Sequence, residues 1–385
     1  MKVLQIHNEY NHFGGEDVIV ALENKLLKKN KDVEVSQLIF NNNRLDIRNL
    51  IFNKTSYKKL KNEILKQKPD IIHVHNIFYK ATPSVLKCAK DFDLPVVMTL
   101  HNFRLICLNG LLLRDQKPCL KCVKKTFQLD AVKYNCFQDS KAKTLALSIN
   151  LGYHNKKNTW DGYVDKFIVL SQFAKNMFLN SSLKINSNKI IIKPNSVDDF
   201  NFETSNNDRE DYVFIGRLSN EKGPQIAVEA FNNLPFKLHV IGTGPLEQGL
   251  KIKASGNIIF HGLKSREFIV NTLKKSKALI FPSICFEGLP NTILEAYSTA
   301  TPIISSDIDN IKDIVKNNIT GLHFKTNSAI DLRKKINQFD KLENNMFNIK
   351  SREEYLEKYS HEKNNLSLLK IYQEAIISNE KNKHS

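Results

Sequence analysis

Residues 286–296 read Phe-Glu-Gly-Leu-Pro-Asn-Thr-Ile-Leu-Glu-Ala, and this stretch decides the fold class. An apolar run at 278–282 precedes it and a helical pattern over 292–299 follows, so the sequence predicts a strand, a tight turn and a helix. Such a turn directs backbone N–H groups, and the positive end of the helix dipole, at whatever lies above the helix start. The stretch therefore predicts an α/β protein with an anion-binding turn.

The residue types within this turn fit a sugar nucleotide. Gly288 lets a ligand approach the backbone closely, and Pro290 suits a first helical turn because it has no N–H to leave unsatisfied. Glu287 and Glu295 lie eight residues apart and bracket the turn, and carboxylates accept hydrogen bonds from hydroxyl groups. Phosphate at the N–H groups and hydroxyls at the carboxylates would hold a sugar nucleotide. An ordinary βα turn with surface glutamates is the alternative.

The same alternation of short apolar runs and amphipathic stretches fills both halves of the chain. We expect strands at 3–6, 33–38, 71–75, 96–101, 166–171, 189–194, 212–215, 238–241, 258–262, 278–282, 303–305 and 321–324. Strands that alternate with helices predict mostly parallel sheets covered on both faces, with ligands beyond the carboxyl ends of the strands. The polar run 204–211 suggests a linker, and the expected domains are 1–195, with a Cys-rich insertion at 104–137, and 196–360, followed by a helix at 361–385.

The composition points to an anionic partner. Lys and Arg number 57 against 40 Asp and Glu, a formal net charge of +17. Nucleic acid, nucleotide phosphates and an acidic membrane surface all fit this excess. The lysines are spread along the chain, and basic and aromatic residues rarely interleave, which argues against nucleic-acid binding. The apolar run at the N-terminus is too short for a signal peptide and no window could span a membrane, so we expect a cytoplasmic protein.

Two strand ends in the first half carry candidate site residues. Gly14 and Gly15 follow the first strand and would allow close backbone approach to a ligand. They do not form the G-x-G-x-x-G fingerprint, which argues against NAD, and a plain flexible turn is the alternative. His101 lies at the end of the fourth strand, in Thr-Leu-His-Asn-Phe-Arg at 99–104. A lone histidine is more often structural than catalytic, and its position at a strand end makes a functional role an equal alternative.

Two strand ends in the second half suit phosphate. Gly216 closes the strand at 212–215, and Arg217 and Lys222 follow it. Arg binds a pyrophosphate by forked hydrogen bonds and Lys binds it as a point charge. Gly242 closes the next strand, which makes a second glycine-containing turn. A solvated basic turn is the alternative interpretation.

Four cysteines, Cys107, Cys119, Cys122 and Cys136, lie within 30 residues with the spacing C-x11-C-x2-C-x13-C. In a reducing compartment this pattern favours a structural Zn²⁺ held by four thiolates over disulfides. We interpret the segment as poor in apolar residues, so that a metal would supply the free energy to order it. Four independent thiols, or redox chemistry at Cys-x-x-Cys, are the alternatives.

In this order the motifs resemble the retaining glycosyltransferases of family four, which have the GT-B fold of two Rossmann-like domains facing across a cleft. The resemblance is carried by Gly14-Gly15, His101-Asn102, Gly216-Arg217-Leu218 with Glu221-Lys222-Gly223, Gly242-x-Gly244 and Glu287-x7-Glu295. The chain is similar, more narrowly, to bacterial polysaccharide-assembly members with His-Asn-Phe-Arg, Cys-x-Asn-Gly and a cysteine cluster. Leu108 stands where Pro is common, and Ser196 where Gly is frequent.

The resemblance implies a role for each motif. Arg217 and Lys222 would neutralise the diphosphate leaving group, and Glu295 would bind the ribose hydroxyls. Glu287 would contact the transferred sugar, and His101 would line the acceptor side. The remaining donor-binding positions implied are Gly14, Gly15, Gly216, Gly242, Gly288, Leu289, Pro290 and Asn291. The last helix would cross back to the N-terminal domain.

The expected activity is therefore transfer of a sugar from a UDP- or GDP-sugar to a lipid-linked or polysaccharide acceptor, in capsule, O-antigen or lipopolysaccharide synthesis. The enzyme would lie at the inner face of the cytoplasmic membrane, where its positive charge suits anionic lipid. We expect structural zinc as a possible component, no catalytic divalent metal and no nucleic-acid partner. A GT-B sugar-nucleotide epimerase or phosphorylase, and a basic zinc-containing nucleic-acid-binding protein, are the alternatives.

Overall fold

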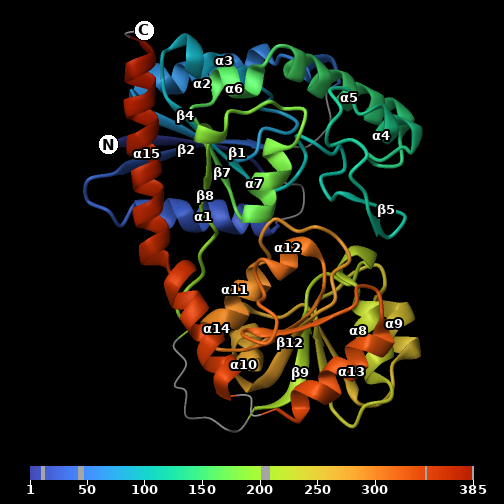
Figure 1. Cartoon of the computed structure of the whole chain (residues 1–385). Coiled ribbons are helices and arrows are strands. Elements are labelled where there is room, and N and C mark those ends of the chain that lie inside the picture. Colours follow the sequence, from blue (N-terminus) through green and yellow to red (C-terminus); the bar gives the residue numbers. More distant parts are fainter. Residues whose placement is uncertain (10–13, 42–46, 201–208, 343–344, 384–385) are drawn as a thin grey trace. The chain divides into compact units, whose positions relative to one another are not determined.

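The computed structural model describes the chain except for residues 10–13, 42–46, 201–208, 343–344 and 384–385 (Figure 1). The chain divides into two compact units. The first comprises Met1–Leu112, Leu120–Asn195 and Asn364–Ser385, and the second comprises Leu113–Cys119 and Ser196–Lys363. Most of the polar run 204–211, which we expected to link the domains, lies outside the described residues.

The first unit is built on a parallel six-stranded sheet with the order β2-β1-β3-β4-β7-β8. Its strands are β1 (Lys2–Glu9), β2 (Glu34–Asn41), β3 (Ile71–Val74), β4 (Val96–Leu100), β7 (Lys166–Val169) and β8 (Ile190–Ile192). Its helices are α1 (Gly15–Leu27), α2 (Lys54–Gln67), α3 (Ser84–Asp91), α4 (Leu129–Lys133), α5 (Lys141–Lys156), α6 (Thr159–Tyr163), α7 (Gln172–Leu179) and most of α15 (His361–Lys383).

The C-terminal helix completes the core of this first unit. Leu368, Ile371, Tyr372 and Ala375 of α15 are buried and pack in one cluster with Val3, Leu27, Ile71, Val97 and Ile168. The strands are covered on both faces, which explains why they read as continuous apolar runs rather than as alternating patterns. Residues 364–385 therefore fold with the first unit although they follow the second along the chain.

The second unit repeats the architecture with the order β11-β10-β9-β12-β13-β14. Its strands are β9 (Glu210–Ile215), β10 (Leu238–Ile241), β11 (Ile258–Gly262), β12 (Ser276–Phe281), β13 (Ile303–Ser306) and β14 (Gly321–Phe324). Its helices are α8 (Pro224–Phe231), α9 (Glu247–Lys253), α10 (Arg266–Lys275), α11 (Asn291–Ser298), α12 (Asp309–Lys312), α13 (Ala329–Asp340) and α14 (Asn345–Lys358). A short hairpin of β5 (Leu113–Arg114) and β6 (Lys117–Pro118) also belongs to it.

The strand order locates the ligand-binding edge of the second sheet. From β9 the chain adds β10 and β11 on one side, and then returns to add β12 on the other side of β9. Ligands of open parallel sheets bind beyond the carboxyl ends of the strands at such a reversal. The turns after β9 and β12 are therefore the expected binding turns, and they are the two that carry the cations and carboxylates singled out in the sequence.

The predicted α/β class is confirmed, and each expected strand is present within one or a few residues of its predicted ends. No helix in the described part of the chain is both long enough and apolar enough to cross a bilayer.

Candidate functional site

The turn after β9 is packed directly against the end of β12. Gly223 has a φ of +67°, and a Cβ at this position would lie 2.1 Å from the carbonyl oxygen of Pro282. The carbonyl oxygen of Glu221 accepts from the backbone N–H of Ile284 at 2.9 Å and from Ser283 Oγ at 3.0 Å. Only glycine permits this approach, so the two turns form one rigid edge of the second unit.

Lys222 and Glu287 meet across this edge. Lys222 Nζ donates to Glu287 Oε2 at 2.5 Å, and Ser283 Oγ donates to Glu287 Oε1 at 2.7 Å. Burial would lower the pKa of Lys222, but the attraction of Glu287 outweighs it and the pKa is raised. An ammonium group has three N–H donors, so Lys222 keeps donors for a second anion. Arg217 lies exposed on the same turn.

Gly242 brings a third strand end into the same edge. Its φ is +135°, and a Cβ there would lie 2.0 Å from the carbonyl oxygen of Gly216. Any larger residue would therefore separate the turns after β9 and β10. Gly242 thus allows the backbone of the two turns to pack closely, as expected for a glycine at the ligand-binding edge of such a sheet.

Helix α11 starts without a side-chain cap. It begins at Asn291, its N-cap is Pro290, and no side chain accepts from its first N–H groups. Asn310 Nδ2 donates to the carbonyl oxygen of Glu287 at 2.6 Å and so holds the turn that contains Gly288 and Leu289. An uncapped helix start leaves backbone donors for a ligand, and the helix dipole favours an anion there.

Glu295 lies on α11 and faces a cation that the sequence analysis missed. Arg266 of α10 places Nε 3.5 Å from Glu295 Oε1 and also donates to Asp198 Oδ2 at 2.5 Å. Burial raises the pKa of Glu295, and Arg266 partly opposes this rise. The position of Arg266 in the sequence matches no motif with the glycines or glutamates of the site, so its contact with Glu295 is seen only in the folded structure.

Gly14 and Gly15 form the start of α1 in the first unit. Gly14 is the N-cap of α1, and its backbone N–H donates to Asp17 Oδ2 at 2.8 Å. Asp17 Oδ1 also lies 2.8 Å from His7 Nε2 at the end of β1. The paired glycines therefore lie at an anchored helix N-terminus, beyond the carboxyl end of β1.

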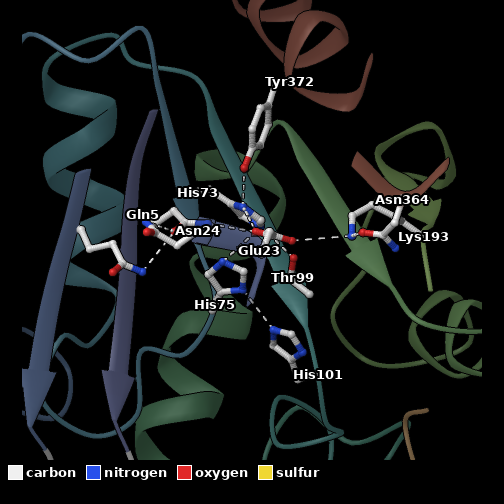
Figure 2. Close-up of polar contacts among 11 residues, drawn as sticks. Gln5, Glu23, Asn24, His73, His75, Thr99, His101, Lys193, Asn364 and Tyr372 are labelled. Carbon is white, nitrogen blue, oxygen red and sulfur yellow. Dashed lines mark hydrogen bonds and ion pairs between the residues drawn. The ribbon is translucent and has the colours of Figure 1, made fainter. Parts of the chain in front are cut away.

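His101 follows β4 in the first unit and is half-buried (Figure 2). Its Nε2 lies 3.0 Å from Nδ1 of His75, which follows β3. Burial chiefly, and then the neighbouring His75, place the pKa of His101 well below its ordinary value. His101 is therefore a neutral imidazole at neutral pH.

A buried carboxylate lies behind His75, and the sequence analysis did not identify it. Glu23 of α1 lies 3.1 Å from His73 Nδ1, 3.2 Å from His75 Nε2 and 3.6 Å from Lys193 Nζ (Figure 2). His73 Nδ1 also lies 2.7 Å from the hydroxyl oxygen of Tyr372 on α15. Glu23, His73 and His75 place ligand atoms within 4.8 Å of one another, but Lys193 already supplies the positive charge that a metal ion would bring.

The four-thiolate zinc site stays a prediction. Among the residues that the structure describes, the only His, Cys, Asp or Glu group gathered closely enough for a metal is the one around Glu23. Burial raises the pKa of the Cys122 thiol to about 12, and the nearby Cys107 and Cys136 contribute to this rise. The segment also carries its own apolar packing, which the sequence interpretation underestimated: Leu105, Ile106, Leu108, Val123 and Phe137 are buried.

Two family models together match almost the whole chain. The model described as Glycosyltransferase Family 4 matches residues 14–199, and the one described as Glycosyl transferases group 1 matches residues 184–361. A glycosyltransferase of Methanocaldococcus jannaschii is 26% identical over 97% of this chain and 98% of its own length.

Two further similarities concern a named enzyme and a solved structure. An Escherichia coli UDP-Gal:α-D-GlcNAc-diphosphoundecaprenol α-1,3-galactosyltransferase is 33% identical, over 38% of this chain and 43% of its own length. The structure of Anabaena HepE in complex with UDP and glucose superposes with a TM-score of 0.67 at 13% identity, over 96% of this chain and 98% of that one. The chain therefore belongs to the family-four glycosyltransferases, and its two parallel-sheet α/β units have the GT-B fold.

Proposed function

We propose that this chain is a retaining glycosyltransferase that moves a sugar from a nucleotide-sugar donor to a lipid-linked or polysaccharide acceptor in surface-glycan synthesis. The observation that carries the proposal is the Lys222–Glu287 pair, which lies where the strand order of the second unit reverses. The E. coli relative, by its name, transfers galactose from UDP-galactose to a diphosphoundecaprenol-linked sugar. The Anabaena structure holds UDP and glucose, which supports a UDP-sugar donor.

Each donor group has a chemically matched position in this proposal. The remaining N–H donors of Lys222, the exposed guanidinium of Arg217 and the uncapped start of α11 bind the diphosphate. The Glu287 carboxylate accepts hydroxyls of the transferred sugar, and Glu295 accepts those of the ribose. Gly14 and Gly15 bring the start of α1 close to the substrates, and His101 contacts a sugar hydroxyl.

The mechanism follows from where charge develops. As the bond between the anomeric carbon and the phosphate oxygen breaks, positive charge grows on the sugar and negative charge on the leaving diphosphate. Lys222, Arg217 and the helix start stabilise this negative charge. The acceptor hydroxyl attacks the anomeric carbon from the face that the diphosphate leaves, and its proton passes to the leaving phosphate oxygen. The new glycosidic bond then keeps the configuration of the donor.

Proton NMR of the product tests the stereochemistry, because anomeric coupling constants distinguish the two configurations. The proposal predicts the same anomeric configuration in product and donor, and an inverted product would contradict it. A parallel incubation with the donor and without an acceptor distinguishes a transferase from an epimerase. A change of configuration within the donor sugar would favour an epimerase, whereas an unchanged donor supports a transferase.

We also propose that the first unit binds an anionic membrane surface through α5. Leu145, Ile149 and Tyr153 are 42%, 48% and 42% exposed and recur every four residues, so they form one apolar stripe on the outer face of this helix. Residues 120–157 contain eight lysines against two aspartates, and α5 itself contains no acidic residue. An apolar stripe among lysines fits the interface of an anionic bilayer.

The inner face of α5 carries both apolar and polar residues. Leu147 and Leu151 are buried, and so are Thr144, Ser148, Asn150 and His154. Thr144 Oγ1 donates to the carbonyl oxygen of Ser140 at 2.6 Å, and His154 lies 3.0 Å from Thr159 Oγ1 and 3.2 Å from the carbonyl oxygen of Ile51. The helix thus docks on its own unit through both apolar and polar contacts, and Leu145, Ile149 and Tyr153 remain exposed on its outer face.

Vesicle flotation tests this surface with phosphatidylglycerol and phosphatidylcholine vesicles. We expect the wild type to float with the anionic vesicles only, and Leu145→Gln/Ile149→Gln to remain unbound. Ile252→Gln, at a residue of α9 that is 85% exposed, is the matched control and should bind normally. Equal flotation of the double variant would contradict the proposal, as would a dimer of the wild type that dissociates in that variant.

A further inference from the structure

A continuous line of contacts leads from the buried carboxylate of Glu23 to His101. Glu23 Oε1 lies 3.2 Å from His75 Nε2, and His75 Nδ1 lies 3.0 Å from His101 Nε2 (Figure 2). Glu23 and His75 are buried, whereas His101 is half-buried at the carboxyl end of β4. The line therefore connects the interior of the first unit to the edge where its ligand is expected.

Glu23 is held as a carboxylate in this interior. Lys193 Nζ lies 3.6 Å from its Oε2, and Gln5 Nε2 donates to its Oε1 at 3.0 Å. Burial alone would raise the pKa of Glu23, but the attraction of the carboxylate to the protonated forms of His73 and His75 outweighs it, so the pKa lies well below its ordinary value. Lys193 is in turn held by Asn364 Oδ1 of α15 at 2.9 Å. A fixed negative charge therefore faces His75.

The carboxylate determines which nitrogen of His75 carries the proton. Burial, chiefly, lowers the pKa of His75 to about 4, so the ring is neutral and has one N–H. The 3.2 Å contact of Nε2 with Glu23 Oε1 falls short of hydrogen-bond geometry, and Nε2 has no hydrogen-bond partner in the described part of the chain, so the carboxylate is the charged group that it faces. If the proton were on Nδ1 instead, the lone pair of Nε2 would face the Glu23 carboxylate. Both groups would then be hydrogen-bond acceptors, with no donor between them. The proton therefore lies on Nε2.

The same reasoning assigns the donor in the contact between His75 and His101. With its proton on Nε2, His75 has a lone pair on Nδ1, which can only accept a hydrogen bond. The group 3.0 Å away is Nε2 of His101, which must then be the donor. A neutral His101 that carries its proton on Nε2 has a lone pair on Nδ1, and that nitrogen can accept a hydrogen bond from a hydroxyl group.

We propose that Glu23 and His75 are positioning residues that hold His101 in a single tautomer, so that its Nδ1 accepts a hydrogen bond from a substrate hydroxyl. The substrate part of this inference rests on the proposed function. The tautomer part does not, since it follows from contacts within the first unit alone. The fixed carboxylate thus acts on the site through two histidine rings, without touching the substrate itself.

Two substitutions of His75 separate an acceptor role from a packing role. In His75→Asn the side-chain oxygen can occupy the place of Nδ1, because both atoms are attached to Cγ, and it can accept the proton of His101. In His75→Phe the ring is retained but no acceptor remains. Thermal unfolding of both variants checks that the first unit is folded, and His101→Gln assigns the His101 signals.

The primary measurement is the side-chain ¹⁵N spectrum of the full, ligand-free chain labelled at histidine. We expect wild-type His101 with protonated Nε2 and unprotonated Nδ1, the same state in His75→Asn, and a mixture of tautomers in His75→Phe. A wild-type His101 protonated on Nδ1, or an unchanged tautomer in folded His75→Phe, would overturn the inference. This measurement needs no substrate, so it does not depend on the transferase activity.

Steady-state kinetics then test the consequence for turnover. Loss of one oriented hydrogen bond should lower kcat about tenfold in His75→Phe, and His75→Asn should restore much of that loss. Suppose that the tautomers are as predicted but kcat is equal in the wild type and both variants. This result would show that His101 does not act on the substrate, and it would contradict its proposed role while leaving the tautomer assignment intact. Equal losses in both variants, despite different tautomers, would contradict the positioning role.

Discussion

Lys222 Nζ lies 2.5 Å from Glu287 Oε2, and this contact joins the turn after β9 to the turn after β12. The two residues are 65 positions apart in the sequence. Their side chains are 30% and 12% exposed, so the pair is only partly screened by water. The cation proposed for the phosphate and the carboxylate proposed for the sugar are therefore already aligned with each other before a donor binds.

Replacement of Lys222 by Ala should lower kcat by about 100- to 1,000-fold, the usual cost of removing one donor that stabilises transition-state charge. The fold should persist, because Ser283 still donates to Glu287. Steady-state kinetics with a saturating donor measure the loss. Lys251→Ala is the control, since Lys251 pairs with Glu247 on exposed α9 and should be dispensable. A fully active Lys222→Ala enzyme would refute the phosphate assignment.

The pair should also behave as one unit in a double-mutant cycle. Glu287→Gln keeps a hydrogen-bond acceptor but removes the charge that attracts Lys222. Because the two side chains are in contact, the effects of Lys222→Ala and Glu287→Gln on kcat/KM should fall short of additivity by about 0.5–3 kcal/mol. Additive effects would mean that the contact has no part in turnover.

Glu295→Gln should weaken donor binding while it stabilises the unliganded protein at neutral pH. The folded-state pKa of Glu295 is raised, mainly by burial, so its contribution to stability is present at low pH and is lost as pH rises through that pKa. Glutamine avoids this loss, and Arg266 keeps Asp198 as a partner. The Tm difference between variant and wild type should therefore grow from pH 4.5 to pH 7.5.

The matched control for this substitution is Glu229→Gln, at an exposed position on α8. Its Tm should follow that of the wild type across the same pH range. A Tm difference for Glu295→Gln that is constant with pH would contradict the raised pKa. Unchanged donor affinity in Glu295→Gln, measured by calorimetric titration, would contradict the ribose assignment.

His154 should make the first unit less stable in mild acid. Burial lowers the pKa of His154 to about 4, so the folded state resists protonation. The stability that this provides is present above pH 6.5 and is lost as pH falls toward 4, by about 2 kcal/mol at pH 5. Trp160 is the single tryptophan, and its ring lies 5.8 Å from that of His154. Urea unfolding followed by Trp160 fluorescence at pH 7 and pH 5 measures the loss.

A His154→Gln variant gives the comparison, because glutamine does not titrate. Its stability should change less between pH 7 and pH 5 than that of the wild type. Parallel curves for the two proteins would show that His154 is not the group responsible.

The sequence predicted the fold well because buried parallel strands read as apolar runs. Runs such as 71–75 and 278–282 are short, and Pro69 before the first and Pro282 at the end of the second favour strands over longer buried helices. The turns proposed for the donor were equally visible, since Gly216, Lys222 and Glu287 lie in the segments that follow such runs. These features depend on a few neighbouring residues, and local sequence therefore determines them.

The remaining site features depend on contacts between distant residues. Glu23, His75 and Lys193 come together only because α1, β3 and β8 belong to one sheet and its covering helices. Arg266 reaches Glu295 in the same way. The zinc site stays a prediction, because cysteine spacing alone does not fix where the thiols lie. Apolar side chains such as Leu108 and Phe137 also pack the segment.

Thermal-shift titration with UDP-, GDP- and ADP-sugars tests the central claim most directly, namely that the turns after β9 and β12 bind a nucleotide sugar. Stabilisation grows with donor concentration and reaches about 2.7 kcal/mol at one hundred times Kd. We predict that at least one donor raises the Tm of the wild type and of Lys251→Ala, and raises that of Lys222→Ala much less. Equal shifts in wild type and Lys222→Ala, or no shift with any donor, would contradict the account.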